Sequence, residues 1–221
     1  MKNLILLYFV FLFSVNTFSQ LKGSGKTTTQ TFNYTNFDKI SLIDIDGTFD
    51  VQVGKSFGIS VTIDDNLAPL LVVDNNVTNN EVAISLKGNR NNKLYIEDTK
   101  IKVKITLPAL TAIKNDSNGA LNITNITGNY LKIETVDNGS TIASGAISNL
   151  EIKNVGNGVL SAENLFAKNA KIQACGNGNA VVNVSELITA KTSGNNSVIN
   201  IGKAKFGTES KSSGYSRFVN Q

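Results

Sequence analysis

Histidine and tryptophan are absent from the 221-residue chain, and cysteine occurs once, at Cys175. Without histidine, Ser-His-Asp catalysis, Cys-His catalysis and histidine-ligated metal sites are unavailable. A single cysteine excludes a disulfide framework. Proline is also scarce, with 2 residues, whereas glycine numbers 18 and asparagine 30. This composition is typical of many short strands joined by turns rather than of helices.

Residues 1–19 are predicted to be a secretory signal peptide. Lys2 supplies the positive charge, residues 4–15 are almost all apolar, and the small residues Thr17 and Ser19 precede an expected cleavage before Gln20. The apolar run is shorter than the roughly 20 residues that a spanning helix needs. We therefore expect an exported protein in the periplasm or at the cell surface, with no transmembrane segment in its mature chain.

The stretch "GSGKTTT", which begins at Gly23, is similar to the end of a phosphate-binding loop. The full motif would need a glycine where Gln20 stands, and the residues that follow show no helical period. We interpret "GSGK" as a flexible part of an N-terminal lead-in (20–36) and expect no nucleotide or other cofactor. The net charge of +4 comes from scattered cations, so nucleic acid is not expected as a partner either.

A repeat of about 20 residues runs through the second half of the chain. Four segments each carry an isoleucine five residues before an Asn-Gly pair, and a looser copy begins at Ala190. The isoleucines are Ile113, Ile133, Ile152 and Ile172, and the asparagines are Asn118, Asn138, Asn157 and Asn177. The Asn-Gly pairs recur at intervals of 20, 19 and 20 residues. A strand-like repeat of this period predicts an all-β fold, a single-stranded right-handed parallel β-helix (solenoid) with coils of about 20 residues.

Stacking the repeats predicts which side chains share a column. The isoleucines form an inward column, and two outward columns alternate in charge, which gives Glu134 and Glu151 a structural role. The outward columns are Lys114, Glu134, Lys153, Gln173 and Ala112, Lys132, Glu151, Lys171. Cys175 lines up with Val136 and Val155, and we expect a small buried apolar side chain there rather than a reactive thiol. Each Asn-Gly pair is expected to turn a corner in the left-handed conformation, with a possible asparagine stack along the corners.

The first half of the chain shows the pattern less regularly. Alternating strands between Asn, Asp and Gly clusters indicate wider, irregular coils over 37–109, before the regular coils of 110–207 and a tail at 208–221. A separate antiparallel sandwich is the alternative. We expect Phe32, Tyr34 and Phe37 to close the N-terminal end, because an open solenoid end exposes sheet edges.

The order of these segments resembles the head GIN domain family. The resemblance is carried by "GSGK" before a β-prone run, "FDKI" at Phe37, "DGTFDVQVG" from Asp46, and the turn at Pro108 leading into Gly/Asn-rich coils. It covers about residues 23–207. Members are exported bacterial proteins labelled auto-transporter adhesin heads, so the resemblance implies an exported β-solenoid with an adhesin-like role.

Carboxylate pairs are the candidates considered for a polysaccharide-active enzyme. A polysaccharide lyase or hydrolase on a β-helix would need two carboxyl groups in a defined geometry, about 5 Å apart in a retaining enzyme. The acids available in the repeats are Asp116, Glu134, Asp137, Glu151, Glu163 and Glu186. Two of them are expected in charge ladders and Asp137 at a turn, so no catalytic residue is assigned and an enzyme is kept only as the alternative.

Three Asp/Asn-rich stretches offer oxygen ligands for calcium, at residues 44–47, 64–66 and 115–119. None has the full spacing of an EF-hand loop, so we expect turns rather than a metal site.

Lys100, Lys102 and Lys104 alternate with apolar residues and fall on one strand face. They are the binding candidates for an anionic glycan or phosphate surface, with a solvated face that protects a sheet edge as the other interpretation. The sequence thus favours a non-catalytic exported surface or interaction protein that binds a glycan, matrix or envelope partner. It does not predict the oligomeric state.

Overall fold

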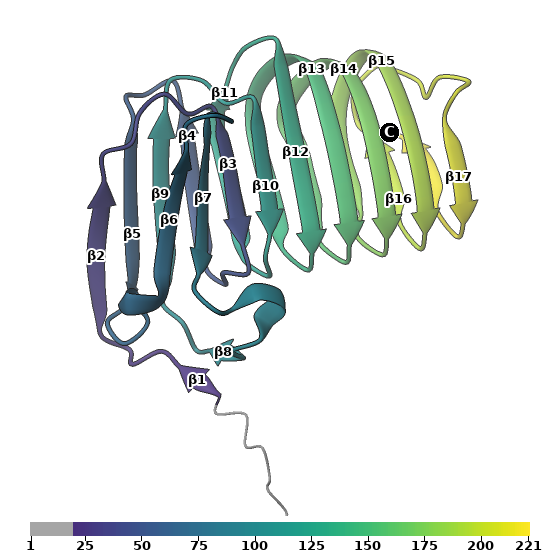
Figure 1. The fold of residues 1–221 in the computed structure, drawn as a ribbon. Coiled ribbons are helices and arrows are strands. Elements are labelled where there is room, and N and C mark those ends of the chain that lie inside the picture. The colour runs from purple at the N-terminus through teal and green to yellow at the C-terminus, as the bar shows by residue number, and fades with distance from the viewer. Residues whose placement is uncertain (1–19) are drawn as a thin grey trace, which may run out of the picture.

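The computed structural model describes residues 20–221, so the predicted signal peptide lies outside the described residues. From residue 112 on, the chain winds into a parallel β-solenoid (Figure 1). Its strands are β10 (Ala112–Asp116), β11 (Ala120–Ile126), β12 (Tyr130–Asp137), β13 (Ser140–Gly156), β14 (Leu160–Gly176), β15 (Ala180–Gly194), β16 (Ser197–Asn200), β17 (Lys211–Gly214) and β18 (Arg217–Asn220).

Each coil contributes to two layers, which we call the near sheet and the far sheet as they lie in Figure 1. The long strands β13, β14 and β15 each run through both sheets. The near sheet contains β10, β12, the second parts of these long strands, and β17. The far sheet contains β11, their first parts, β16 and β18. Strands descend in the near sheet and ascend in the far sheet while the chain advances toward its C-terminus (Figure 1). The coil is therefore right-handed, as predicted.

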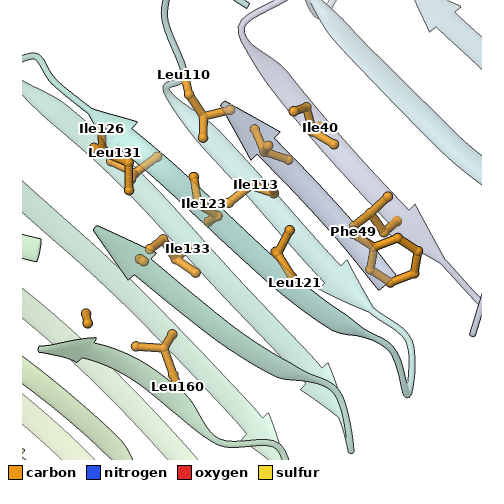
Figure 2. Close-up of a cluster of buried hydrophobic side chains, with 14 of the residues drawn as sticks. Ile40, Phe49, Leu110, Ile113, Leu121, Ile123, Ile126, Leu131, Ile133 and Leu160 are labelled. Atoms are coloured by element: carbon orange, nitrogen blue, oxygen red, sulfur yellow. The ribbon is translucent and has the colours of Figure 1, made fainter. Parts of the chain in front are cut away.

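The predicted register is confirmed. Ile113 pairs with Ile133, Ile133 with Ile152, and Ile152 with Ile172 along parallel strands. All four isoleucines are buried, because every second residue of a strand points into the space between the layers. Figure 2 shows the labelled side chains of both layers meeting there. Burial of each such side chain contributes about 1.5–3 kcal/mol.

The N-terminal half continues the same two sheets but in a different chain order. Its strands are β1 (Leu21–Lys22), β2 (Thr27–Phe32), β3 (Lys39–Ile43), β4 (Thr48–Val53), β5 (Gly58–Asp64), β6 (Leu71–Asn76), β7 (Glu81–Leu86), β8 (Ile96–Glu97) and β9 (Lys102–Leu107). Two 3-10 helices, η1 (Ala68–Leu70) and η2 (Arg90–Asn92), lie between them. β3 lies between β7 and β10 in the near sheet, and β4 lies between β9 and β11 in the far sheet.

The coil made by β7 and β9 therefore precedes the coil of β3 and β4 in space, although it follows in sequence. Antiparallel strands complete this end: β6 pairs with β7, β5 with β9, and β2 with β5. The sheet is continuous with the solenoid, so the separate sandwich is wrong. β3 with β4 and β7 with β9 form irregular coils of the same solenoid, as predicted, whereas the antiparallel β2, β5 and β6 extend the sheet without forming coils.

Aromatic side chains close both ends of the core. Phe37 is buried and packs against Phe57 with ring centroids 5.1 Å apart. Phe32 and Tyr34, 6.0 Å apart, also pack against the core, as expected for the N-terminal end. At the C-terminal end, Phe206 stacks on Phe218 at 4.7 Å.

Cys175 is exposed, so the prediction that it is buried is wrong. It does share a column with Val136 and Val155, but that column points outward. The reason is parity, because Cys175 lies three residues after the inward Ile172 whereas inward positions recur every two. The inward neighbour is Ala174, which is 3% exposed.

The segment around "GSGK" is tied to the body of the protein rather than flexible. Asp64 accepts hydrogen bonds from the backbone N–H groups of Gly25 (2.8 Å) and Lys100 (2.6 Å). Ser24 donates its hydroxyl to Asp65 (2.5 Å) and its N–H to Asn66 (2.9 Å). The stretch that is similar to the end of a phosphate-binding loop and the Asp/Asn-rich stretch 64–66 thus bind each other.

Candidate functional site: the asparagine edge

The corners after β10, β12, β13 and β14 carry a ladder of hydrogen-bonded asparagines. The side-chain amide of Asn138 donates to Asn118 (2.9 Å), Asn157 donates to Asn138 (2.8 Å), and Asn177 donates to Asn157 (2.7 Å). All four side chains are exposed. They lie along the lower margin of the solenoid in Figure 1, which we call the asparagine edge. The expected asparagine stack is confirmed.

Glycine next to each asparagine makes this stacking possible. A Cβ atom on Gly158 would lie 2.2 Å from the carbonyl oxygen of Gly139, and one on Gly178 only 1.9 Å from that of Gly158. The left-handed residue comes one position before the asparagine, at Asp137 (φ 64°) and Gly156 (φ 110°). The expectation that the Asn-Gly residues themselves are left-handed is therefore wrong, and close approach of backbones explains the glycines instead.

A hollow of about 950 Å³, which we call the near hollow, lies at the N-terminal end of the asparagine edge. The connection between β7 and β9 hangs below the lower ends of β3 and β10 there (Figure 1). The lining residues are Ile43, Asp44, Ser85, Leu86, Lys87, Gly88, Arg90, Asn91, Lys114, Asp116, Asn118, Val136, Asp137 and Asn138.

Asp44 holds the overhanging connection in place. Its carboxylate accepts a hydrogen bond from the backbone N–H of Asn91 (2.8 Å), and its carbonyl oxygen accepts one from the side chain of Asn89 (2.7 Å). Asn89 in turn accepts from the N–H of Leu94 (3.1 Å). Asp44 is therefore a structural residue at the hollow, and residues 44–47 form the connection from β3 to β4.

The near hollow presents charges of both signs. Lys114 and Asp116 neutralise each other at 2.5 Å. Within residues 20–221, Lys87, Arg90 and Asp137 form no salt bridge. This arrangement offers two cationic donors and one carboxylate acceptor to a polar ligand, beside the exposed amides of the edge.

A second hollow of about 530 Å³, the far hollow, lies at the other end of the asparagine edge. It is lined by Asn177, Asn179, Asn195, Asn196, Ser197, Tyr215 and Arg217. Tyr215 is 88% exposed and follows directly after β17. Arg217 at the start of β18 donates to the hydroxyl of Ser197 (3.2 Å). Amides, a guanidinium and an exposed aromatic ring thus meet at this end.

Several of the carboxylates that were considered for catalysis form ion pairs with lysines or accept hydrogen bonds from hydroxyl groups. Lys153 binds Glu134 at 2.8 Å and Lys132 lies 3.7 Å from it. Partial burial alone would raise the pKa of Glu134, but the hydrogen bond and charge of Lys153, with the charges of Lys132 and Lys114, bring it below its ordinary value. The expected role of Glu134 in a charge ladder is confirmed.

Glu151 accepts a hydrogen bond from the hydroxyl of Tyr130 (2.9 Å) instead of a lysine. Burial, followed by the hydrogen bond and negative charge of Glu151, raises the pKa of Tyr130. Glu163 accepts from Ser161 (3.3 Å), and Glu186 is exposed. Within residues 20–221 there is also no cluster of three or more Asp, Glu, His or Cys side chains suited to a metal ion.

Of the three lysines predicted as a binding face, Lys102 and Lys104 lie on β9 in the far sheet, and Lys100 lies in the connection just before it. Lys100 donates to the carbonyl oxygen of Gly25 (3.0 Å) and so helps to hold the N-terminal segment. Lys102 and Lys104 are exposed on β9, where Lys104 faces Asp50 of β4 in register. The structure does not bring these lysines together with either hollow.

Sequence reasoning found the ladder but missed both hollows. The Asn-Gly period was a sufficient signal for the edge, because a repeat must stack like residues on one another. The connection that covers the near hollow has no repeat, and Tyr215 lies beyond the last recognisable copy.

None of the helical segments within residues 20–221 has the length and apolarity needed to cross a bilayer.

Comparison with known proteins supports this architecture. A family model described as "Putative auto-transporter adhesin, head GIN domain" matches residues 36–204. A crystal structure described as a "putative adhesin" from Bacteroides fragilis NCTC 9343 is similar, with a TM-score of 0.66, 20% identity, and coverage of 91% of this chain and 100% of that one.

Two Parabacteroides structures share the fold at 18% identity, each covering 91% of this chain and 99% of their own. One is a "putative adhesin" from Parabacteroides merdae ATCC 43184, with a TM-score of 0.55. The other is described as a "Putative lipid binding protein" from Parabacteroides distasonis ATCC 8503, with a TM-score of 0.56. Among curated proteins, none matches the chain.

Proposed function

Because the chain belongs to the head GIN domain family, we propose that it is a non-catalytic, exported adhesin that binds a glycan along the asparagine edge. Export rests on the signal peptide predicted at residues 1–19 and on the adhesin description of the family. The periplasm and the cell surface are both compatible with it.

The observation that carries the proposal is the hydrogen-bonding capacity left over in the ladder. A side-chain amide has two N–H donors and an oxygen with two lone pairs. Asn138 and Asn157 each donate once and accept once within the ladder. Each therefore keeps one donor and one acceptor for a ligand, repeated at about the 4.8 Å spacing of the coils. A chain of sugar hydroxyls, which donate and accept alternately, matches such a row.

The two hollows extend this row at both ends. The near hollow adds the cations Lys87 and Arg90, and the far hollow adds the exposed ring of Tyr215. Concave sites with a few convergent polar groups are where proteins hold small or chain-like ligands. Because the ladder links the two, a linear glycan is favoured over a compact ligand.

A catalytic role is not supported by the carboxylates of the near hollow. Asp116 is neutralised by Lys114, and the carboxylate of Asp44 is bound by the backbone of Asn91. Asp137, which forms no salt bridge within residues 20–221, is then left without a second carboxylate that is free to act with it. Glycoside hydrolysis uses two carboxyl groups in concert.

The test uses the mature chain, residues 20–221, on a panel of polysaccharides and matrix proteins, with retention and product release read together. The double variant Asn138→Ala, Asn157→Ala should bind the retained glycan about tenfold more weakly, since each lost hydrogen bond contributes roughly 0.5–1.5 kcal/mol. Asn164→Ala is the matched control, because Asn164 is exposed on β14 away from the edge.

Unchanged affinity in the double variant would refute the asparagine edge as the site. Release of reducing ends or unsaturated sugars would refute the non-catalytic role. Retention on liposomes alone, in line with the description of one structural relative, would replace the glycan with a lipid.

A further inference from the structure

The C-terminal half of the near sheet carries one outward lysine on each of four successive coils. Lys153 lies on β13, Lys171 on β14, Lys191 on β15 and Lys211 on β17. Lys153, Lys191 and Lys211 share one column, in which Gln173 is the β14 member. Because coils repeat about every 4.8 Å, these four residues, the lysine row, extend about 14 Å along the solenoid axis.

Ion pairing divides the near sheet into two halves. Toward the N-terminal side, lysines have carboxylate partners: Lys114 pairs with Asp116, and Lys132 and Lys153, the first member of the lysine row, share Glu134. Further along, the pairing stops.

Within residues 20–221, Lys171, Lys191 and Lys211 form no salt bridge. Two carboxylates lie near: Glu151 is opposite Lys171 in register but is bound by Tyr130, and Glu209 lines the hollow beside Lys171 and Lys191.

Ion pairing within the fold does not account for the lysine row. Lys191 and Lys211 face each other directly on adjacent strands, and like charges in this position destabilise a sheet. In the same column further back, a glutamate alternates with lysines. At Lys191 and Lys211 the charges no longer alternate. A ligand that supplies the missing negative charge explains this change better than the fold does.

Two shallow hollows lie between these lysines. The first has a volume of about 220 Å³ and is lined by Lys171, Ile172, Gln173, Thr189, Ala190, Lys191 and Glu209. The second has a volume of about 410 Å³ and is lined by Lys153, Val155, Gln173, Ala174, Cys175, Lys191, Thr192 and Ser193. Both share Gln173 and Lys191, so they form one continuous surface. An amide, hydroxyl groups and ammonium groups are therefore available to the same ligand.

We infer that the lysine row is a second binding surface, which takes a linear polysaccharide carrying regularly spaced carboxylate or sulfate groups. A polymer fits better than a single anion, because the cations come one per coil along a straight axis. No aromatic side chain lines either hollow, so the stacking that single-stranded nucleic acids use is missing. The inference goes beyond the glycan proposed for the asparagine edge, since the chemistry and the face are different.

The test measures binding of the mature chain to polygalacturonate (carboxylate) and to a heparin-type sulfated polysaccharide, with neutral dextran as a reference. The variant Lys171→Gln, Lys191→Gln, Lys211→Gln should bind the polyanion about tenfold more weakly, because exposed charge pairs each contribute modestly. The affinity of the unmodified chain should also fall as salt is raised. All three side chains are exposed, so circular dichroism should show an unchanged fold.

Two control variants make the result specific. Lys102→Gln, Lys104→Gln removes two exposed lysines of the far sheet, and Lys168→Gln, Lys203→Gln removes two exposed lysines that line neither hollow. Both should retain polyanion binding.

Equal loss in the Lys102, Lys104 variant, or no loss in the triple variant, would overturn the inference. So would tighter binding to single-stranded DNA or to anionic phosphatidylserine vesicles than to either polysaccharide. Failure of the asparagine variant to bind neutral glycan bears only on the edge, so the two proposals can fail separately.

Discussion

Replacing Gly178 with alanine should destabilise the solenoid strongly. The new Cβ atom would lie 1.9 Å from the carbonyl oxygen of Gly158, so the corner has to open. Opening would break three hydrogen bonds. One is donated by the side-chain amide of Asn177 to that of Asn157 (2.7 Å), and two are accepted by the carbonyl oxygen of Gly156 from the N–H groups of Asn177 (2.8 Å) and Gly178 (3.1 Å). At roughly 0.5–1.5 kcal/mol each, their loss predicts a decrease of about 2–4 kcal/mol in the free energy of unfolding. For a chain of this size the melting midpoint should fall by roughly 5–15 °C.

Gly54→Ala is the matched control for this reasoning. Gly54 has φ 82°, and a Cβ atom added there would have no heavy atom within 4 Å, so alanine costs only conformational strain of about 1–2 kcal/mol. Urea denaturation followed by far-UV circular dichroism and by tyrosine fluorescence gives both values, and coincident curves justify a two-state treatment. If Gly178→Ala is no more destabilising than Gly54→Ala, close stacking does not explain the corner glycines.

Three further predictions address other features. The pKa of Glu134 lies below its ordinary value of 4.5, so its contribution to stability is present above that value and is lost as the pH falls through the lowered one. In the Glu134→Gln variant the free energy of unfolding should therefore fall less on acidification than in the unmodified protein. Urea midpoints measured at pH values from above 4.5 downward test this. Cys175 should react with a maleimide in the native protein, whereas the variant Ala174→Cys, Cys175→Ser, whose single thiol is at the buried position, should react only after unfolding. Asp64→Ala should free the segment around Gly25 and destabilise the protein by about 3 kcal/mol, with faster proteolysis at residues 20–26.

The repetitive half was predictable because its repeat and its packing obey the same period. A residue that recurs every 20 positions must stack on its own copies, which placed Ile133 on Ile113 and Asn138 on Asn118 without any knowledge of the corners. The alternation of strand faces is equally strict. Cys175 was misplaced only because an apolar-looking column was read as inward against that alternation.

The N-terminal half resisted prediction for a physical reason. Its coils stack in an order that differs from the sequence, and antiparallel strands such as β5 and β6 close the end. Pairings of this kind leave no period, because each strand meets a partner of unrelated sequence. Alternation in β9 identified a strand, but it could not show that Lys104 would face Asp50 or that Lys100 would bind the N-terminal segment.

The near hollow follows from this chain order rather than from a motif. β7 belongs to the near sheet and β9 to the far sheet, so residues 87–101 must cross the same lower margin where the regular coils turn. Between β10 and β11 that crossing takes only residues 117–119. The longer connection extends over the next corners, where the N–H of Asn91 donates to Asp44. Together with Asn118 and Asn138 it lines the near hollow. The repeat supplies a uniform row of amides, and the irregular crossing of residues 87–101 makes the N-terminal end of that row different from the rest.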